Sequence, residues 1–333
     1  MKRIAINGFG RIGRLTARQI LKNPNLEIVG INDLTDNQTL AHLFKYDSAH
    51  GIFDGTVSYD DQSITINGKK IKSTSIKEVS QLPWKELNVD VVLECTGVFL
   101  AADQCSLHLA AGARKVILSA PPKDTSIPTF VLGVNDSEIS SDINILSNAS
   151  CTTNCLAPVI KILDESLGLQ FASMNTIHAY TQDQRLQDAP HKDLRRARAA
   201  AINLVPTSTG AAKAVEVVYP KIKGKLLASS YRVPLITGSM IELVCVMNRP
   251  VTVEEVNEVF KQAAGSTYKG LVQYNEDEIV SSDIIGNPHS SIFDAPLTQN
   301  KGDKLKLVAW YDNESGYSAR LSDMCAKVAS LID

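Results

Sequence analysis

The sequence lacks the features that mark several large classes of protein. Its 333 residues include only six cysteines, and the 34 Lys+Arg nearly balance the 36 Asp+Glu. That balance argues against a dedicated nucleic-acid partner, and 44% hydrophobic residues argue against disorder. No apolar run approaches the roughly 18 residues of a membrane span, so no membrane partner is expected. The first apolar run ends at Asn7-Gly8, too short for a signal peptide.

The cysteines are scattered, with no Cys-x-x-Cys pair and no clustered framework. Six such thiols in a chain of this length predict reduced, mostly buried cysteines and a cytoplasmic protein. Only Cys151 and Cys155 form a local pattern.

The chain also lacks repeats, low-complexity tracts and Pro/Gly-rich linkers, so a domain boundary has to come from a change of pattern. At roughly 100–200 residues per domain, the length predicts two domains. In the first part, short apolar strands alternate with helices, which indicates a parallel sheet covered on both faces. We expect strands at 3–7, 27–32, 89–94 and 115–119, helices at 11–22 and 101–111, and a hairpin at 55–73 around Asn67-Gly68.

After about residue 150 the strands lengthen and the intervening helices become fewer. A helix over 151–167 is followed by expected strands at 171–179, 226–234, 240–248 and 304–312, with helices at 252–264 and 317–332. The fold class is therefore α/β: a Rossmann-type doubly wound, mainly parallel sheet plus an α+β catalytic domain with a mixed or antiparallel sheet. We expect an NAD-binding domain at 1–149 and a catalytic domain at 150–315, with the C-terminal helix at about 316–333 packing back on the first.

A phosphate-binding turn is indicated by Gly8-Phe9-Gly10-Arg11-Ile12-Gly13. This G-x-G-x-x-G run follows an expected strand and opens an expected helix. Gly8 allows the tight turn, Gly10 the approach of a pyrophosphate, and Gly13 close packing of helix on strand. Asp33 ends the next strand, where it can accept hydrogen bonds from ribose hydroxyls and repel a 2′-phosphate. The pattern favours NAD over NADP; the alternative is an ordinary glycine turn with a surface aspartate.

A reactive thiol is indicated at Cys151, where an expected strand gives way to an expected helix. The positive end of a helix favours the thiolate, which is the reactive form of cysteine. A merely buried thiol is the alternative. A zinc site would need two further ligands that the neighbourhood does not supply, so no metal is expected. A thiolate nucleophile needs a base or cation, and His178, at the end of a β-patterned run, is one of six histidines that could serve.

A cluster of positive charge, His191-Lys192-Asp193-Leu194-Arg195-Arg196-Ala197-Arg198, is followed by Pro206-Thr207-Ser208-Thr209-Gly210. One interpretation is a solvated basic loop. The other is an anion site in which guanidinium, hydroxyl and backbone N–H groups converge on phosphate. Arg232, at the end of an apolar strand, is a second candidate.

Seven blocks of sequence, in order, resemble the phosphorylating glyceraldehyde-3-phosphate dehydrogenase family over essentially the full length. They are NGFGRIGR (7–14), ECTG (94–97), SNASCTTNCLAP (147–158), HAYT (178–181), RRARAAA (195–201), PTSTGAAKAV (206–215) and WYDNE (310–314). The resemblance implies that Cys151 is the nucleophile and His178 the base that activates it.

The resemblance also implies binding residues. Those that match the family's site for inorganic phosphate are Ser150, Thr152, Arg198, Thr209 and Gly210. Those that match its site for the substrate's own phosphate are Thr181 and Arg232. Those that match positions around NAD are Gly8, Gly10, Arg11, Ile12, Gly13, Asp33, Lys77, Ser119 and Asn313. Leu34 and Pro190 resemble the NAD-preferring branch, whereas Ser315 replaces residues that are often bulkier in the family.

The implied activity is the conversion of glyceraldehyde 3-phosphate, NAD and inorganic phosphate to 1,3-bisphosphoglycerate and NADH. The implied assembly is a homotetramer, with residues 180–204 near a neighbouring subunit's cofactor. Erythrose-4-phosphate dehydrogenase is an alternative, although that branch usually departs from HAYT and PTSTGAAK. A redox-sensing or binding protein that uses the same cysteine is an alternative from another class.

Overall fold

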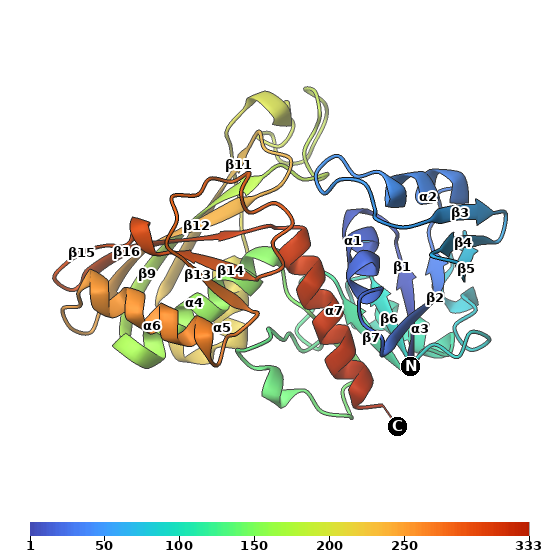
Figure 1. The fold of residues 1–333 in the computed structure, drawn as a ribbon, viewed down its shortest axis with the longest axis horizontal. Coiled ribbons are helices and arrows are strands. Elements are labelled where there is room, and N and C mark those ends of the chain that lie inside the picture. Colours follow the sequence, from blue (N-terminus) through green and yellow to red (C-terminus); the bar gives the residue numbers. More distant parts are fainter. Residues whose placement is uncertain (333) are drawn as a thin grey trace. The chain divides into compact units, whose positions relative to one another are not determined.

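The computed structural model describes residues 1–332, which form two compact units (Figure 1). The first unit comprises residues 1–130, 137–150 and 318–332 of the described chain. The second comprises Val131–Asp136 and Cys151–Tyr317. Each unit is built around one large sheet.

The first unit contains an eight-stranded sheet in the order β3-β4-β5-β2-β1-β6-β7-β8. Its strands are β1 (Lys2–Asn7), β2 (Leu26–Asn32), β3 (Val57–Asp60), β4 (Ser63–Ile66), β5 (Lys69–Thr74), β6 (Val91–Glu94), β7 (Lys115–Leu118) and β8 (Ile145–Ser147). Its helices are α1 (Arg11–Ile20), α2 (Asn37–Lys45) and α3 (Ala102–Ala110). Within this order, every neighbouring pair in the run β5-β2-β1-β6-β7-β8 is parallel.

The central strands of this sheet are buried on both faces, as continuous apolar runs predict. All four residues of β6 and of β7 are buried. The chain leaves β1 toward β2 on one side and later returns to place β6 on the other side of β1. This reversal creates a switch point at the carboxyl ends of β1 and β6, where doubly wound sheets usually bind their ligands.

The hairpin expected at 55–73 is a three-stranded extension of the sheet. β3 pairs with β4 and β4 with β5, both antiparallel, while β5 lies parallel to β2. Asn67 and Gly68 both have positive φ, at 50° and 78°, as the primed turn typical of Asn-Gly requires. The segment is therefore part of the first sheet.

The second unit also has an eight-stranded sheet, and this one is mixed. The main order is β10-β11-β9-β12-β16-β14-β13, with β15 paired to β16. The strands are β9 (Leu169–Ala179), β10 (Val205–Thr207), β11 (Leu226–Val233), β12 (Ser239–Met247), β13 (Val272–Asn275), β14 (Ser291–Asp294), β15 (Gln299–Lys301) and β16 (Lys304–Tyr311). β9 is parallel to β11 but antiparallel to β12.

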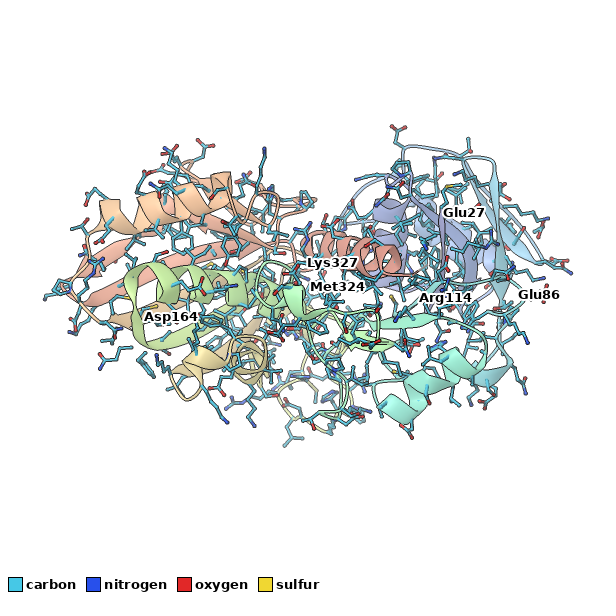
Figure 2. The ribbon with its side chains drawn as sticks, turned by 90° about the horizontal axis from the view of Figure 1, so that it is seen from below. Glu27, Glu86, Arg114, Asp164, Met324 and Lys327 are labelled. Carbon is cyan, nitrogen blue, oxygen red and sulfur yellow. The ribbon has the colours of Figure 1, made fainter. Side chains whose placement is uncertain are left out.

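Three helices pack along this sheet: α4 (Cys151–Leu167), α5 (Ala211–Val218) and α6 (Val253–Gly265) (Figure 1). α4 carries apolar residues on most of its surface and is buried over most of its length. Asp164, labelled in Figure 2, accepts a hydrogen bond from the Tyr219 hydroxyl at 2.8 Å and so ties α4 to the end of α5. Thr252 caps α6 by accepting from the Glu255 N–H at 3.1 Å, as its capping-box spacing predicts.

The predicted fold class is confirmed: one mainly parallel α/β sheet and one mixed sheet. The helix expected at 317–332 is α7 (Ser315–Ser330), and its residues from 318 onward group with the first unit. Helices α2 and α5 and strands β10, β13, β14 and β15 were not predicted. Within residues 1–332, no helix is both long and apolar enough to cross a membrane.

Candidate active site

The glycine-rich turn lies directly after β1 and is shaped for close approach. Gly8 has φ of +90°, and a Cβ there would lie 2.6 Å from the backbone nitrogen of Thr96. A Cβ on Gly13 would lie 2.2 Å from the Gly8 carbonyl oxygen. A Cβ on Gly10 would meet nothing within 4 Å, so open space lies beside it. Close backbone contacts thus require glycine at positions 8 and 13, whereas Gly10 leaves the open space that the dinucleotide fingerprint expects beside it.

Helix α1 begins immediately after Gly10, which has no side chain that could cap its first N–H groups. A helix start of this kind suits a pyrophosphate, because the N–H groups and the helix dipole both favour an anion. The residues present therefore fit a dinucleotide. Ile12 lies in the first turn of α1.

Asp33 lies one residue beyond β2, and two backbone groups fix its carboxylate. Phe9 N–H donates to Oδ2 at 2.7 Å, and Thr35 N–H donates to Oδ1 at 3.0 Å. The first bond joins the end of β2 to the glycine turn. Both oxygens keep lone pairs that ribose hydroxyls could use.

Arg11 points its side chain into the protein. Its guanidinium lies 2.5 Å from Asp47 Oδ2, and 3.3 Å separate it from His50 Nδ1. Burial raises the pKa of Asp47, but hydrogen bonds from His50 and Arg11 outweigh it and hold the pKa well below its usual range. This partly buried ion pair anchors the start of α1 and engages the side chain of Arg11.

A groove of about 490 Å³ opens beside Asp33. This volume falls within the range of roughly 300–1,000 Å³ that is usual for small-molecule sites. Its lining residues come from the segment after β2, from the β3–β4 turn and from the end of β5: Leu34, Thr35, Asp36, Asn37, Gln38, Tyr59, Asp60, Asp61, Ser73, Thr74 and Ser75.

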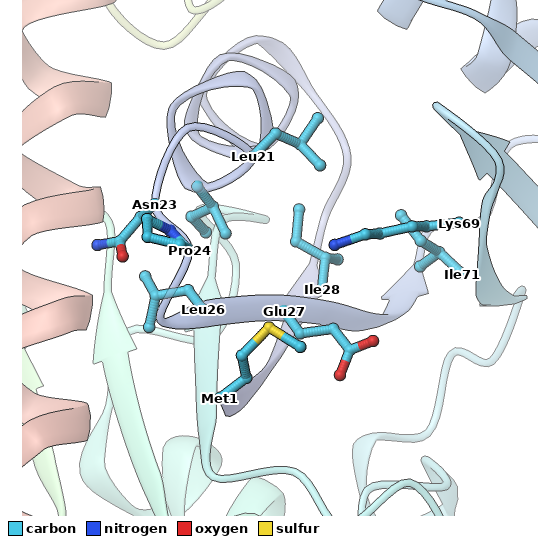
Figure 3. A pocket seen from close by; sticks show the side chains of 10 residues that line it. Met1, Leu21, Asn23, Pro24, Leu26, Glu27, Ile28, Lys69 and Ile71 are labelled. Atoms are coloured by element: carbon cyan, nitrogen blue, oxygen red, sulfur yellow. The ribbon is translucent and has the colours of Figure 1, made fainter.

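A second, smaller pocket of about 70 Å³ lies at the opposite ends of β1 and β2 (Figure 3). Met1, Leu26 and Ile28 give it a mainly apolar wall, with Glu27 and Lys69 as its charged members. It is far below the usual size of a ligand site.

Two further predicted cofactor residues also follow strands of the first sheet. Ser119 comes one residue after β7, and its N–H donates to the Glu94 carbonyl at 2.9 Å. Lys77 is exposed three residues beyond β5. Both lie at the carboxyl edge of the sheet, as does the glycine turn.

The predicted nucleophile, Cys151, is the first residue of α4. Three residues separate β8 from this helix, and among them Ala149 is buried with φ of +55°. A non-glycine residue in this region is strained by about 1–3 kcal/mol. The sharp bend brings Cys151 to the helix start, directly after Ser150.

Cys151, at the start of α4, and His178, near the end of β9, lie close together in the structure. The Cys151 Sγ lies 3.5 Å from His178 Nε2. His178 is the penultimate residue of β9 and is buried. Of the six histidines, it is the one for which the structure records a contact with this thiol.

The other nitrogen of His178, Nδ1, lies 2.7 Å from the Ala179 carbonyl oxygen. A carbonyl can only accept, so this contact favours a proton on Nδ1, which would leave Nε2 able to take a proton from the thiol. Arg232 faces His178 in register on the parallel strand β11, with its NH1 in contact with Nδ1 and 3.2 Å from the same carbonyl. The guanidinium can only donate, so its contact with Nδ1 favours the other tautomer. Nδ1 therefore lies between a donor and an acceptor, and the carbonyl oxygen is within reach of both Nδ1 and Arg232.

Burial and the neighbouring charge of Arg232 lower the pKa of His178 to about 3, so the ring is neutral near pH 7. Burial also raises the pKa of the Cys151 thiol, although Arg232 and bonds from Thr152 oppose this. The helix start alone predicts the opposite direction for the thiol. In this state the pair is a thiol beside a neutral imidazole, so His178 has to remove the proton as the thiol reacts.

Tyr311, at the end of β16, is a site residue that our sequence analysis missed. Its buried hydroxyl lies 3.0 Å from Thr152 Oγ1 and 2.8 Å from Thr176 Oγ1. Its ring packs edge-on to His178, with the centroids 5.9 Å apart. Tyr311 thus links the turn of the nucleophile to the strand of the base, and only its place in the WYDNE block could have indicated it.

Asn313 has a fixed amide orientation within the second unit. Its Oδ1 accepts from Gly238 N–H at 3.2 Å and from the Ser239 hydroxyl at 2.9 Å. The Ser239 hydroxyl in turn accepts from Ala179 N–H at 3.1 Å. Because Oδ1 faces these donors, the Nδ2 end is the donor available to a ligand.

Two candidate anion-binding elements follow β9 and β10. The Thr181 hydroxyl donates to Asp183, whose other oxygen pairs with Arg196 at 2.7 Å. Burial raises the pKa of Asp183, but this bond together with Arg232 and Arg196 lowers it below its usual value. Thr209 and Gly210 form the start of α5, and a Cβ on Gly210 would meet nothing within 4 Å.

The structure does not bring Arg198 to these elements. Arg198 pairs with Asp188 at 2.9 Å, and both side chains are more than half exposed. Arg196 instead donates to the Thr207 hydroxyl at 2.6 Å and lies 3.5 Å from the Ser208 carbonyl oxygen. Of the two arginines, Arg196 is the one that faces the threonine-rich segment, and the spacing of the basic cluster could not distinguish them.

Among residues 1–332, no group of three or more His, Cys, Asp or Glu side chains is placed to hold a metal ion. Cys155 is fully buried, with its thiol 3.6 Å from the Ser291 hydroxyl, and packs as a core residue.

A chain that combines a doubly wound unit carrying a dinucleotide turn with a mixed-sheet unit carrying a thiol–imidazole pair has the construction of an NAD-dependent dehydrogenase. Two family models match the chain. The model described as glyceraldehyde 3-phosphate dehydrogenase, NAD binding domain, matches residues 2–102, and the C-terminal domain of the same enzyme matches residues 150–313.

Curated relatives agree with these matches. The chain is 53% identical to the glyceraldehyde-3-phosphate dehydrogenases of Mycobacterium avium and Mycolicibacterium smegmatis, with 98% of each chain covered. It is 50% identical to glyceraldehyde-3-phosphate dehydrogenase 1 of Bacillus cereus over 99% of each chain. The chain belongs to the glyceraldehyde-3-phosphate dehydrogenase family.

Proposed function

We propose that this protein oxidises glyceraldehyde 3-phosphate with NAD and captures the product with inorganic phosphate, giving 1,3-bisphosphoglycerate. The observation that carries the proposal is the 3.5 Å approach of Cys151 Sγ to His178 Nε2, with Arg232 paired in register beside the histidine. Relatives named glyceraldehyde-3-phosphate dehydrogenase, matched over 98% of each chain, support this choice of substrate.

In the first step, Cys151 adds to the substrate aldehyde as its proton passes to His178, which returns that proton to the former carbonyl oxygen. The product is a hemithioacetal. His178 suits this task because its ring is neutral, and we place its proton on Nδ1, donated to the Ala179 carbonyl, so that Nε2 faces the sulfur as the acceptor. Arg232 supplies positive charge next to the developing anion.

NAD, when bound, would supply the acceptor for the hydride of the hemithioacetal carbon. His178 receives the proton of the hemithioacetal hydroxyl, and Cys151 is left as a thioester. Phosphate then attacks the thioester carbon, the C–S bond breaks, and Cys151 leaves as the thiolate. The proton held by His178 then restores the Cys151 thiol, and the proton of the attacking phosphate leaves to solvent.

We assign the cofactor to Gly8, Gly10, Gly13, Asp33, Ser119 and the backbone of Arg11 and Ile12, with Lys77 at the edge. Asn313 would present its Nδ2 donor to the cofactor. We assign the substrate's phosphate to Thr181 and Arg232, and inorganic phosphate to Ser150, Thr152, Thr209 and Gly210. Arg196, rather than Arg198, is the arginine that we place at the inorganic phosphate, because it bonds Thr207.

The domain assignment follows from where the proposed cofactor and substrate residues lie in the sequence. Residues 1–149 would bind NAD and 150–315 would carry the chemistry, with the C-terminal helix belonging to the first domain. The two compact units and the two family matches support this division. We further propose a homotetramer in the cytoplasm. Leu186, Leu194 and Ile202, each at least 80% exposed in the single chain, support a subunit contact by residues 180–204.

The test is NADH formation by the purified protein with NAD and each of two aldehydes. Glyceraldehyde 3-phosphate should support rapid turnover that requires inorganic phosphate. Preference for erythrose 4-phosphate, or turnover that is independent of phosphate, would overturn the proposal. Sedimentation in the same buffer tests the tetramer separately.

A further inference from the structure

A line of polar side chains crosses the first sheet at its carboxyl edge, below the glycine turn. Thr74, Asn32, Asn7 and Glu94 end four neighbouring strands, and each is paired in register with the next. Their side chains are hydrogen-bonded in the same order. The Thr74 hydroxyl donates to Asn32 Oδ1 at 2.9 Å, Asn32 Nδ2 to Asn7 Oδ1 at 2.8 Å, and Asn7 Nδ2 to Glu94 Oε2 at 2.6 Å.

Glu94 ends this line as a fully buried carboxylate. Its Oε1 accepts from the backbone N–H of Thr96 at 2.8 Å and from the Thr96 hydroxyl. Its Oε2 accepts from Asn7 and lies 3.0 Å from His108 Nε2. Because both oxygens face donors, neither has a place for a proton, and the side chain is a carboxylate anion.

His108 is held in one tautomer by Trp84. The Trp84 indole N–H can only donate, and it lies 2.9 Å from His108 Nδ1. Nδ1 must therefore be the acceptor, so the proton of the neutral ring is on Nε2 and points at Glu94. Trp84, His108 and Glu94 are all at most 1% exposed, so water does not compete for these bonds.

The glycine turn packs against the backbone of residues 95–96, the segment that is hydrogen-bonded to Glu94. A Cβ on Gly8 would lie 2.6 Å from Thr96 N and 2.8 Å from the Cys95 carbonyl carbon. The Cys95 N–H also donates to the Asn7 carbonyl at 2.7 Å. Since Gly8 packs directly on the 95–96 peptide, the position of that peptide sets the position of the turn and of the start of α1.

We propose that Glu94, oriented by His108 and Trp84, is a positioning residue for NAD: it fixes the Thr96 backbone on which the Gly8 turn rests. This inference rests on the proposed binding of NAD at that turn. Replacement of Glu94 by Gln would leave a group that can only donate facing an amide N–H in either orientation of the amide: the Thr96 N–H in one, and Asn7 Nδ2 and His108 Nε2–H in the other. His108 could not adapt by moving its proton, because Trp84 occupies Nδ1.

The test compares Glu94→Gln with Glu27→Gln in the full-length protein. Glu27 is a control in the same sheet, near the start of β2, where it pairs with Arg3 at 3.5 Å (Figure 2). Calorimetry should show that Glu94→Gln weakens NAD binding about tenfold, as an unpaired buried donor would. Glu27→Gln should change it less than about twofold, since exposed ion pairs contribute little. At saturating NAD, kcat should remain within about threefold of wild type, because the thiol chemistry is untouched.

Hydrogen exchange of the protein without NAD provides the second readout. Glu94→Gln should speed exchange of the amides at 8–12 and 95–98 while leaving those of β9 and β12 unchanged. If Glu94→Gln lowers the melting temperature but leaves both the NAD affinity and this exchange at wild-type values, the inference is overturned and Glu94 only stabilises the fold. Failure of the wild-type protein to bind NAD would instead overturn the proposed function, and the exchange comparison would still decide the role of Glu94.

If Glu94→Gln does not fold, the pair His108→Gln and His108→Leu makes the same test. Gln can still donate to Glu94, whereas Leu cannot. We expect the Leu variant to bind NAD at least about fivefold more weakly than the Gln variant, because only Leu leaves a buried carboxylate oxygen without its donor. Equal affinities, with equal exchange at 95–98, would contradict the proposal.

Discussion

The cofactor turn of the first unit and the thiol centre of the second unit are built in different ways. The turn is made by consecutive residues, Gly8 to Gly13, plus one aspartate from the next strand. The thiol centre takes Cys151 from a helix start, His178 from β9, Arg232 from β11 and Tyr311 from β16. The residues of the cofactor turn are therefore close together in the sequence, whereas the residues of the thiol centre come together only through the strand register of the second sheet.

This difference bears on where each site tolerates change. At the turn, we expect backbone groups to make most of the contacts with a ligand. The sequence requirement there is the absence of a side chain at Gly8 and Gly13, where a Cβ would clash with the backbone. At the thiol centre, side-chain atoms carry the chemistry and are held by neighbours distant in sequence. Substitutions should therefore act mainly on NAD affinity in the first unit and mainly on kcat in the second.

The largest effect should come from Cys151→Ser, which removes the nucleophile. We expect turnover to fall at least about a thousandfold, with NAD affinity within about twofold of wild type. The matched control is Cys155→Ser, one helical turn away in the core, which should keep most of the turnover. Steady-state kinetics with calorimetry of NAD separates the two; equal losses in both variants would show that Cys151 has no special role.

The next largest effect is expected for His178→Asn, which removes the base and keeps a side chain of similar reach. We expect kcat to fall about 10²–10⁴-fold, the usual contribution of a positioned acid–base group. The rate of Cys151 alkylation by iodoacetamide near pH 7 should fall as well, because the buried thiol has a raised pKa and loses the group that accepts its proton. Unchanged alkylation would contradict the assignment of His178.

A smaller effect should distinguish the two arginines. Arg196→Leu should raise the KM for inorganic phosphate by about 10–100-fold, because a charge-assisted bond is lost at Thr207 and the anion site. Arg198→Leu should change the same KM by no more than about threefold, because that side chain pairs at the surface with Asp188. The reverse order of effects would favour the assignment implied by resemblance alone.

Asp33→Asn tests the first unit. The lost charge should weaken NAD binding about tenfold and bring the affinities for NAD and NADP closer together, because the carboxylate no longer accepts ribose hydroxyls or repels a 2′-phosphate. Calorimetry with both nucleotides measures this. A proportional loss for both would mean that Asp33 acts only through its bond to Phe9 N–H.

The smallest expected effect is that of Tyr311→Phe. It leaves two buried threonine hydroxyls without their shared partner, at a cost of about 1–2 kcal/mol in the free energy of unfolding. We expect a melting temperature a few degrees lower and a kcat reduced by less than about tenfold. A thermal scan with parallel kinetics checks both; an unchanged melting temperature would show that the hydroxyl does not support the site.

The same difference explains how far the sequence could be interpreted. The alternating strands and helices of the first unit predict its sheet, and the bounds of α4 are those expected from the pattern at 151–167. Helix α5, with eight residues, and strands β10, β13, β14 and β15 are short and lie outside the regular alternation of strands and helices that marks the similarly short β6 and β7. The three-stranded form of 57–74 depends on β5 pairing with β2, which no local pattern records.

Among site residues, spacing could indicate the glycine turn, Asp33 and the helix-start thiol. It could not select His178, because the pairing of His178 with Cys151 depends on how β9 meets α4. Nor could it choose Arg196 over Arg198, since the two are separated by one residue and differ in the direction of the side chain. The sequence also could not predict the raised pKa of Cys151, because its cause is burial, which is a property of the folded chain.

The central claim is that the reaction passes through a thioester on Cys151 that phosphate releases. Intact-protein mass spectrometry after mixing with NAD and glyceraldehyde 3-phosphate, without inorganic phosphate, tests it most directly. We predict one burst of NADH per active site and one phosphoglyceryl group on Cys151, lost when phosphate is added. Sustained NADH formation without phosphate and without any adduct on Cys151 would contradict the account.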